Sequence, residues 1–396
     1  MWRVLLVAFI VACGSPAAKP DGALGDDDAP GSGSDTGGDG SGGGTGQWVL
    51  GYYVGYDISS YPIASIDWTA LTHVAFAPMV VKADQTLDFS FDDQQGMGPQ
   101  HAMDLATAAH AHGVKALLML GGAGAGPNIA NAARPANRAA FVTRLLDALS
   151  TLGYDGIDLD WEDSVVLDDL VGLAHDLRAA KPDIVLSYPG GMINGNFQTV
   201  DARMAQLAAS LDRFFVQSYY PSTAVAGSGW DSWFLAPQSG VSPTTPIAAD
   251  DTLMRHEAVG IPKAKLGLGI GAYAICYTGG ITGPRQPTGS NTQITGGDNT
   301  YPLRLFFAAG STFANAAATA KKYDAVAQQP YLSFTAAVND AHCGGNTQYI
   351  SYEDEQSIHA KATFSRGQGY GGVIVWTINE MTPATMTALH DGFLAP

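Results

Sequence analysis

The feature that most constrains the fold is a regular alternation of short apolar strands with helical segments, which starts at Trp48 and runs almost to the C-terminus. Eight runs have the length and the β-branched and aromatic content of strands. They are Trp48–Val54, Thr72–Ala77, Val114–Leu120, Gly156–Glu162, Ile184–Tyr188, Arg213–Tyr219, Leu266–Gly271 and Val373–Trp376. Strands that alternate with helices pair in parallel, so the pattern predicts an α/β fold, a closed (β/α)8 barrel of the TIM type rather than an open sheet.

Two of the intervening segments carry clear helix signals. In residues 138–153, apolar side chains recur every three or four positions, and Gly153 follows as a stop signal. Residues 165–182 repeat the pattern and end at Pro182, which cannot continue a helix. With 46% hydrophobic residues, the chain can bury the large core that such a barrel needs.

The connection between the seventh and eighth strands is far longer than a barrel loop. We expect an insertion there, over about residues 274–350. Loops that follow barrel strands build the active-site face, so the insertion should lie on that face. It contains Cys276 and Cys343, and an even pair of cysteines in an oxidising compartment suggests one disulfide. Two free buried thiols are the alternative.

The N-terminus combines one basic residue with a short apolar run. Arg3 precedes the apolar residues 4–12, which are too few to span a bilayer and fit the core of a signal peptide. Residues 10–13 resemble a bacterial lipobox, so we expect residues 1–13 to be a signal peptide with a lipobox and Cys13 to carry the lipid. An ordinary secretory signal with an incidental cysteine is the alternative.

Residues 14–47 consist mainly of Gly, Ser, Asp and Pro. Such a segment cannot bury enough surface to offset its ordering entropy, so we expect a disordered linker before a folded domain over residues 48–396. The protein should be extracytoplasmic, either lipid-anchored to a bacterial membrane and facing outward or secreted. We expect it to be a monomer. Its formal net charge of −17 argues against nucleic acid as a partner.

The fourth predicted strand ends in a row of acids. Because side chains alternate along a strand, Asp158, Asp160 and Glu162 share one face, and the apolar residues between them share the other. In a barrel the acids would point inward, with Glu162 at the C-terminal mouth. Like charges at close range cannot all ionise, so the cluster should share protons and keep Glu162 able to donate one near neutral pH.

A metal site is the competing interpretation of this cluster, since three carboxylates suit magnesium or calcium. None of the nine histidines falls in a metal-binding spacing, and the tryptophan inside the cluster is not typical of metal loops. We therefore expect no metal and no cofactor.

The motif DGIDLDWE, residues 155–162, resembles the signature of glycoside hydrolase family 18, the chitinases and their relatives. The opening residues 51–53, the second strand and the late segment 349–376 also resemble that family. The resemblance covers the chain from Trp48 to about Thr382. It implies hydrolysis of β-1,4-linked N-acetylglucosamine polymers such as chitin, with retention of configuration.

The resemblance also implies roles for the acids. Members of the family use the N-acetyl oxygen of the sugar as the nucleophile, so one protein acid suffices. Glu162 would be that acid and later the base, and Asp160 would orient the acetamido group and stabilise the positive intermediate. Asp158 would lie beneath them and share a proton.

Further site residues follow by position in the same resemblance. Tyr52 would support Asp158, and Trp376 would form the floor under the reacting sugar. In the motif formed by residues 217–220, Gln217 and Tyr219 would contact the substrate, with Tyr219 bonded to the acetamido carbonyl. Aromatic strand residues are also common in cores, so core packing is the alternative for the two tyrosines and the tryptophan.

Three positions depart from the family pattern. Met119 replaces a serine that would help to hold Asp158, Ala123 replaces an aromatic sugar-stacking platform, and Tyr220 replaces an aspartate or asparagine. Trp230, in the segment after the sixth strand, is the candidate replacement platform.

Two other functions fit the same residues. One is a hydrolase of the same fold that acts on peptidoglycan or on the chitobiose core of N-glycans. The other is a non-catalytic chitin-binding lectin on the cell surface. Lectin-like relatives typically have the acid replaced, and Glu162 is present, which favours an enzyme.

Overall fold

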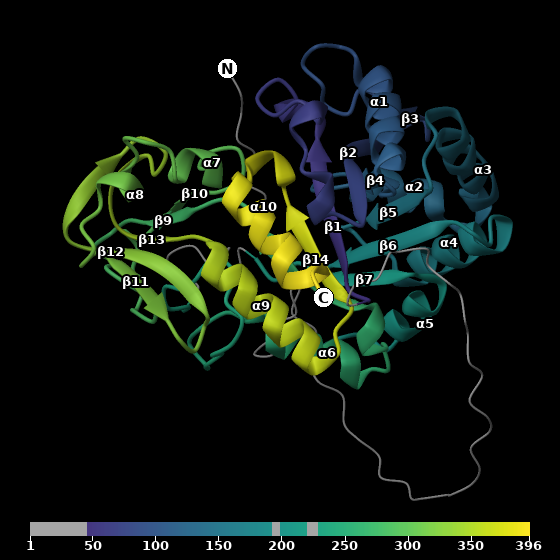
Figure 1. The fold of residues 1–396 in the computed structure, drawn as a ribbon. Coiled ribbons are helices and arrows are strands. Elements are labelled where there is room, and N and C mark those ends of the chain that lie inside the picture. Colours follow the sequence, from purple (N-terminus) through teal and green to yellow (C-terminus); the bar gives the residue numbers. More distant parts are fainter. Residues whose placement is uncertain (1–45, 192–198, 220–228) are drawn as a thin grey trace, which may run out of the picture. The chain divides into compact units, whose positions relative to one another are not determined.

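The computed structural model describes residues 46–191, 199–219 and 229–396. Within these residues, eight parallel strands pair in the order β1-β14-β8-β7-β6-β5-β4-β2, and β1 pairs with β2 to close a barrel. The strands are β1 (Trp48–Val54), β2 (His73–Val81), β4 (Lys115–Gly121), β5 (Gly156–Asp160), β6 (Val185–Gly190), β7 (Arg213–Val216), β8 (Leu266–Gly271) and β14 (Gly372–Trp376). Each overlaps one predicted strand, so the predicted (β/α)8 barrel is confirmed (Figure 1).

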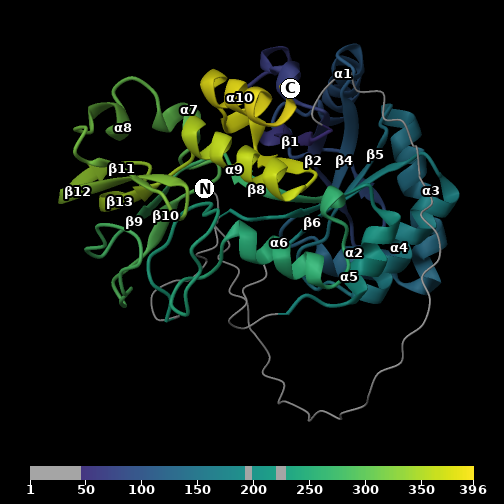
Figure 2. The same ribbon diagram turned by 60° about the horizontal axis from the view of Figure 1, so that its bottom comes forward.

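Helices cover the outside of the barrel (Figures 1 and 2). They are α1 (Gly98–Ala111), α2 (Gly126–Ala133), α3 (Pro135–Leu152), α4 (Leu167–Ala180), α5 (Arg203–Ser210), α6 (Ala249–Ala258), α9 (Glu355–Gln368) and α10 (Pro383–Leu389). The helical spacing expected in residues 138–153 forms most of α3, which buries Phe141, Leu145 and Leu149. It ends at Gly153, whose φ of 78° lies in the left-handed region that glycine adopts at helix ends.

Glycines in β8 make room inside the barrel. Gly267, Gly269 and Gly271 are two residues apart and therefore share one face of the strand. A Cβ on Gly267 would lie 2.4 Å from the ring of Trp48, and one on Gly269 would lie 2.7 Å from the ring of Tyr219. The alternating glycines thus allow two large aromatic side chains to fill the barrel interior.

The insertion between the seventh and eighth barrel strands forms a second sheet. Its five strands pair antiparallel in the order β10-β9-β13-β12-β11. They are β9 (Ile275–Tyr277), β10 (Ile294–Gly296), β11 (Lys321–Asp324), β12 (Gln329–Asp340) and β13 (Gly345–Ser351), with the short helices α7 (Leu303–Phe306) and α8 (Thr312–Asn315). Figure 1 shows this sheet in green, to one side of the barrel. A disulfide joins Cys276 to Cys343.

An ion pair fastens the insertion to the barrel. The guanidinium of Arg304, in α7, donates to Asp57 just after β1 at 2.9 Å, and it also donates to the backbone carbonyl of Asn379 just after β14 at 3.2 Å. The insertion is therefore anchored at the C-terminal ends of two barrel strands, which is the face where barrel enzymes place their sites. The short strand β3 (Leu87–Asp88) pairs antiparallel with the end of β2.

Residues 1–45 lie outside the described residues. The expected signal peptide, the lipidation of Cys13 and most of the expected linker therefore remain predictions. In the described part of the chain, no helix is both long enough and apolar enough to cross a membrane.

Candidate active site

The acid row lies at the C-terminal end of β5. Asp158 and Asp160 are within the strand and are 0% and 3% exposed, whereas Glu162 reaches the surface at the mouth of the barrel. The strand is two residues shorter than predicted, because the N–H of Trp161 donates to the carbonyl of Leu159 at 2.9 Å and turns the chain. Glu162 therefore extends from a turn just past the strand.

Two hydroxyl groups hold the buried carboxylate of Asp158. The hydroxyl of Tyr52, in β1, donates to Oδ2 at 2.8 Å, and the hydroxyl of Ser187, in β6, donates to Oδ1 at 2.5 Å. Burial raises the pKa of Asp158 to about 6; the two hydrogen bonds oppose that rise, and the nearby charge of Glu162 adds to it. Asp158 is thus positioned to exchange a proton near neutral pH.

Ser187 is a site residue that the sequence did not indicate. Met119 in β4 and Ser187 in β6 are the two register partners of Asp158, one on each side. Where this chain has a methionine on one side, a serine on the other side supplies the hydroxyl. Finding it from sequence would have required the strand register, which the alternation of apolar residues alone does not give.

The carboxyl groups of Asp160 and Glu162 lie close enough for each to shift the pKa of the other. No N–H or O–H group of the described residues donates to the buried Oδ1 of Asp160. Like charges at close range cannot all ionise readily, which favours retention of a proton among these acids. Burial raises the pKa of Asp160 well above its ordinary value, and the charges of Glu162 and Asp158 raise it further.

Desolvation by the surrounding protein raises the pKa of Glu162, and the charge of Asp163 raises it further. The amide of Gln217, just past β7, donates to Glu162 Oε1 at 2.8 Å and partly opposes that rise. Glu162 is therefore the one member of the row that combines a raised pKa with access to the surface.

Tyr219 and Trp376 complete the arrangement around the acids. Tyr219 packs against the β8 glycines. Burial raises the pKa of its hydroxyl well above the ordinary value, and the charges of Glu162 and Asp160 add to the rise. Trp376 ends β14 half-buried, and its ring lies 5.1 Å from that of Tyr52 at an angle of 59°. The structure thus brings together the acids, both tyrosines, Gln217 and Trp376.

The glycine-rich loop after β4 is organised by the end of β5. The carboxylate of Asp163 accepts from the N–H groups of Gly124 and Gly126, each at 3.1 Å. The N–H of Gly122 donates to the carbonyl of Asp160 at 2.8 Å. Asp163, which the sequence analysis did not single out, therefore positions the start of α2 directly beside the acid row.

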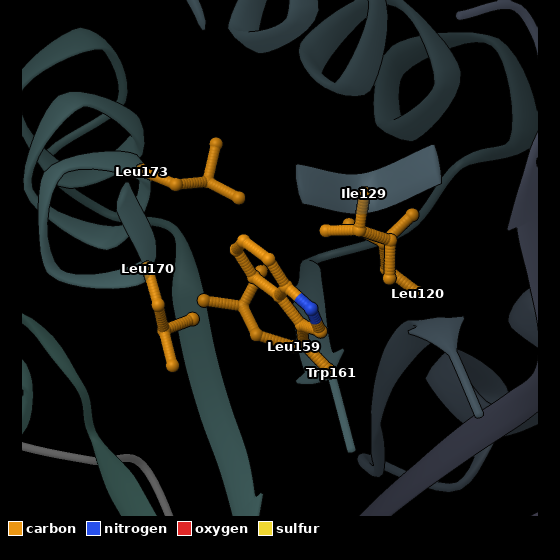
Figure 3. A pocket seen from close by; sticks show the side chains of 6 residues that line it. All are labelled: Leu120, Ile129, Leu159, Trp161, Leu170 and Leu173. Carbon is orange, nitrogen blue, oxygen red and sulfur yellow. The ribbon is translucent and has the colours of Figure 1, made fainter. Parts of the chain in front are cut away.

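The remaining tryptophans differ in position. Trp161 is buried among leucine and isoleucine side chains of β4, β5, α2 and α4, as its place between the acids predicts (Figure 3). Trp233 is also fully buried, so it offers no sugar-stacking surface. Trp230 is half-buried, and its carbonyl accepts from the hydroxyl of Thr288 at 2.6 Å. Ala123 is exposed, and Tyr220 lies outside the described residues.

The described residues contain no group of three or more His, Cys, Asp and Glu side chains arranged to hold a metal ion. The chemistry that the arrangement offers is proton transfer by carboxyl groups, beside an aromatic surface suited to a sugar ring.

Comparison with known proteins places this arrangement in a family. Residues 49–380 match the sequence profile of Glycosyl hydrolases family 18. The chain is 24% identical over 414 residues to a chitinase-like effector of Moniliophthora perniciosa, with 90% of this chain and 87% of that protein covered. It is 27% identical over 333 residues to a probable endochitinase of Caenorhabditis elegans, with 78% and 51% covered.

Among solved structures, the chain resembles a Group IV chitinase of Ostrinia furnacalis in complex with allosamidin. The TM-score is 0.71 at 17% sequence identity, and the match covers 87% of this chain and 98% of the other. At that identity the likeness supports the barrel fold alone. The family match spans most of the chain, and on that basis the protein belongs to glycosyl hydrolase family 18.

Proposed function

We propose that this protein is a chitinase-like enzyme that hydrolyses β-1,4-linked N-acetylglucosamine polymers, with retention and with Glu162 as the acid and base. The observation that carries the proposal is the row of Asp158, Asp160 and Glu162 at the C-terminal end of β5, in which the two aspartates are buried and Glu162 reaches the surface. Two buried acids next to a third destabilise the fold, so their presence calls for a chemical role.

In the first step, the acetamido carbonyl oxygen of the bound sugar attacks its own anomeric carbon. The glycosidic bond breaks, and Glu162 gives its proton to the departing oxygen. The raised pKa of Glu162 keeps that proton available, and Gln217 holds the carboxyl group in place. The product of this step is a positively charged oxazolinium ring.

Asp160 stabilises that ring. In the free enzyme a second proton, separate from that of Glu162, is shared between Asp160 and Asp158. As the ring forms, this second proton passes to Asp158, and the carboxylate of Asp160 then accepts the acetamido N–H and offsets the positive charge. Tyr52 and Ser187 hold Asp158 in place for this exchange. Water then attacks the anomeric carbon, the bond from that carbon to the acetamido oxygen breaks, and the water gives a proton to Glu162. The proton on Asp158 returns to its place between Asp158 and Asp160, which restores the starting state.

The substrate class is supported by the names of the relatives, which include a probable endochitinase, and by the allosamidin bound to the Ostrinia enzyme. The proposed setting is extracytoplasmic, with lipid on Cys13 and residues 14–47 as a tether. It rests on the N-terminal sequence. The protein would act as a monomer on chitin or a related polysaccharide.

The direct test uses protein that lacks the residues before Gln47. It should release the chromophore from a chitobiose analogue, and Glu162→Gln should lower kcat at least a hundredfold, the lower range for loss of a general acid. Tryptophan fluorescence titrated with chitin oligomers would show that the variant still binds. Full activity of Glu162→Gln would contradict the mechanism.

A non-catalytic chitin-binding role is the second candidate, because one relative is named a chitinase-like effector. A panel of chitin, peptidoglycan and N-glycan substrates separates the possibilities. Binding of chitin oligomers by the unaltered protein without hydrolysis of any substrate would favour the lectin. Hydrolysis of peptidoglycan or N-glycan alone would keep the chemistry and change the substrate.

A further inference from the structure

The strand that carries Tyr52 is supported by a side chain at its catalytic end. The register between β1 and β14 ends at Gly51 and Val375, whereas β1 itself continues to Val54. Beyond that point the side chain of Asn379 pairs with the backbone of Val54. Its Oδ1 accepts the Val54 N–H at 2.9 Å, and its Nδ2 donates to the Val54 carbonyl at 3.4 Å. Asn379 therefore joins the two strand ends past the last backbone pair.

Asn379 belongs to the short 3-10 helix η5 (Ile378–Glu380), which follows β14 and lies directly on β1. A Cβ on Gly51 would lie 2.5 Å from the side chain of Ile378, so the glycine in β1 allows this close approach. Ile378 and Asn379 are both 0% exposed. Because the amide of Asn379 is buried, a shift of η5 along β1 would leave polar groups without partners, which is costly.

The insertion reaches the same two strand ends. Nε of Arg304 donates to the backbone carbonyl of Asn379 at 3.2 Å. A terminal nitrogen of the same guanidinium donates to both carboxylate oxygens of Asp57, at 2.9 and 3.2 Å. The N–H of Asn299, in the loop after β10, donates to Glu380 Oε1 at 2.6 Å. One arginine thus links the segment after β1 to the segment after β14, and a second contact from the insertion holds η5.

The joined strand ends carry two aromatic residues of the candidate site. Trp376 is the last residue of β14, and its ring lies 5.1 Å from that of Tyr52 in β1. The hydroxyl of Tyr52 donates to Asp158 at 2.8 Å. The relative position of the two rings depends on how the ends of β1 and β14 meet, and Asn379 and Arg304 join those ends.

We propose that Asn379 and Arg304 are positioning residues, which hold the end of β14 against the end of β1 so that the Trp376 indole stays beside Tyr52 as the floor for the reacting sugar. This inference rests on the proposed function. Loss of either contact should loosen the floor more than it disturbs the acids, because Asp158 keeps a second donor in Ser187. The expected effect is therefore mainly on KM.

The first test is steady-state kinetics with the chitobiose analogue. Asn379→Ala leaves the buried Val54 N–H without its acceptor and should raise KM about tenfold, with kcat within about threefold of normal. Arg304→Ala should raise KM about fivefold. Asp57→Ala breaks the same ion pair, so the double variant with Arg304→Ala should raise KM little beyond either single change.

Arg178→Ala is a matched control. The side chains of Arg178 and Arg304 are both 28% exposed. Arg178 also combines an ion pair, to Asp212 at 2.6 Å, with a bond to a backbone carbonyl, that of Ile184 at 2.6 Å. These partners precede β7 and β6, at the opposite end of the barrel. Arg178→Ala should lower the free energy of unfolding in urea and leave KM unchanged. An equal rise of KM in Arg178→Ala would mean that general destabilisation explains the effect and would overturn the inference.

A readout that needs no substrate is the quenching of tryptophan fluorescence by acrylamide. Each protein is compared with its Trp376→Phe counterpart, so that the difference reports on Trp376 alone. Quenching of Trp376 should increase in Asn379→Ala and Arg304→Ala and stay unchanged in Arg178→Ala. Unchanged quenching in the first two variants would overturn the inference, and so would an unchanged KM in an active protein. If the unaltered protein hydrolyses no substrate, the proposed function fails, and the quenching still decides whether Asn379 and Arg304 hold the indole.

Discussion

At the scale of single residues, the carboxylate of Asp158 depends on hydroxyl groups from two other strands of the barrel. Tyr52 approaches from β1 and Ser187 from β6. The motif spacing and the familial pattern indicated the acids, Tyr52 and Trp376 as candidates. They could not indicate Ser187, because its contact with Asp158 depends on the register of β5 with β6. A local sequence pattern does not determine that register.

We expect Ser187→Ala to lower kcat about tenfold, because it leaves a buried carboxylate oxygen without a donor, a loss of about 1–3 kcal/mol. Since the lost hydrogen bond also lowers the pKa of Asp158, that pKa should rise. The check is kcat for the chitobiose analogue as a function of pH. Ser232→Ala is a matched control, because this equally buried serine donates to the carbonyl of Gly283 at 2.7 Å, away from the acids.

A second substitution next to Asp158 should rescue the activity of the Ser187→Ala variant. Met119 is the register partner of Asp158 on the opposite side, so Met119→Ser should return a hydroxyl to that carboxylate. The double variant Met119→Ser with Ser187→Ala should recover most of the lost kcat. A single variant Ser187→Ala with unchanged kcat and unchanged pH profile would show that Tyr52 alone holds Asp158.

At the scale of elements, the pattern of apolar residues located all eight barrel strands, but it misplaced several of their ends: β2, β4 and β6 run further than predicted, and β5 and β7 stop earlier. Both β5 and β7 end in a tight turn, in which an N–H donates to a carbonyl two residues earlier, from Trp161 to Leu159 and from Ser218 to Val216. Aromatic residues continue past both turns, so the sequence gives no stop signal there. The turns lie where Glu162 and Gln217 meet.

The five strands of the insertion were not predicted individually. The longest, β12, mixes buried and exposed residues without strict alternation, because its pairing with β13 shifts register between Ser333 and Val338. A bulge of this kind breaks the period of two on which strand prediction depends.

Asp163 lies just past β5 and next to the start of α2, and its charge should affect how kcat depends on pH. The charge of Asp163 raises the pKa of Glu162, and its carboxylate also holds the N–H groups of Gly124 and Gly126. Asp163→Asn keeps an acceptor oxygen and removes the charge. The pKa of Glu162 should then fall, and the alkaline limb of the kcat profile should move to lower pH.

The measurement is kcat across pH, with unfolding followed by circular dichroism to exclude loss of structure. Asp84→Asn, which neutralises an exposed acid in the turn before β3, is the control and should leave the limb in place. An alkaline limb that stays in place in Asp163→Asn would mean that burial alone sets the pKa of Glu162.

At the scale of the whole molecule, the active site should destabilise the fold in a definite pH range. The folded-state pKa of Asp158 is about 6, and an unfolded aspartate has a pKa of about 3.9. Between these values the folded protein binds more protons than the unfolded chain, so the free energy of unfolding falls as pH rises through this window. Acids whose pKa is lowered, such as Asp340, act in the opposite direction at lower pH.

We therefore expect the free energy of unfolding to be highest near pH 4–5, at the acid edge of the pH range in which proteins are usually most stable. It should fall by on the order of 2–3 kcal/mol towards pH 7 because of the raised pKa of Asp158. Urea unfolding at a series of pH values measures this. Asp158→Asn, which keeps the shape and removes the titration, should flatten the decline between pH 4 and 6, even if it abolishes catalysis. An equally steep decline in Asp158→Asn and in the unaltered protein would show that the decline comes from other buried acids, among them Asp160 and Glu380.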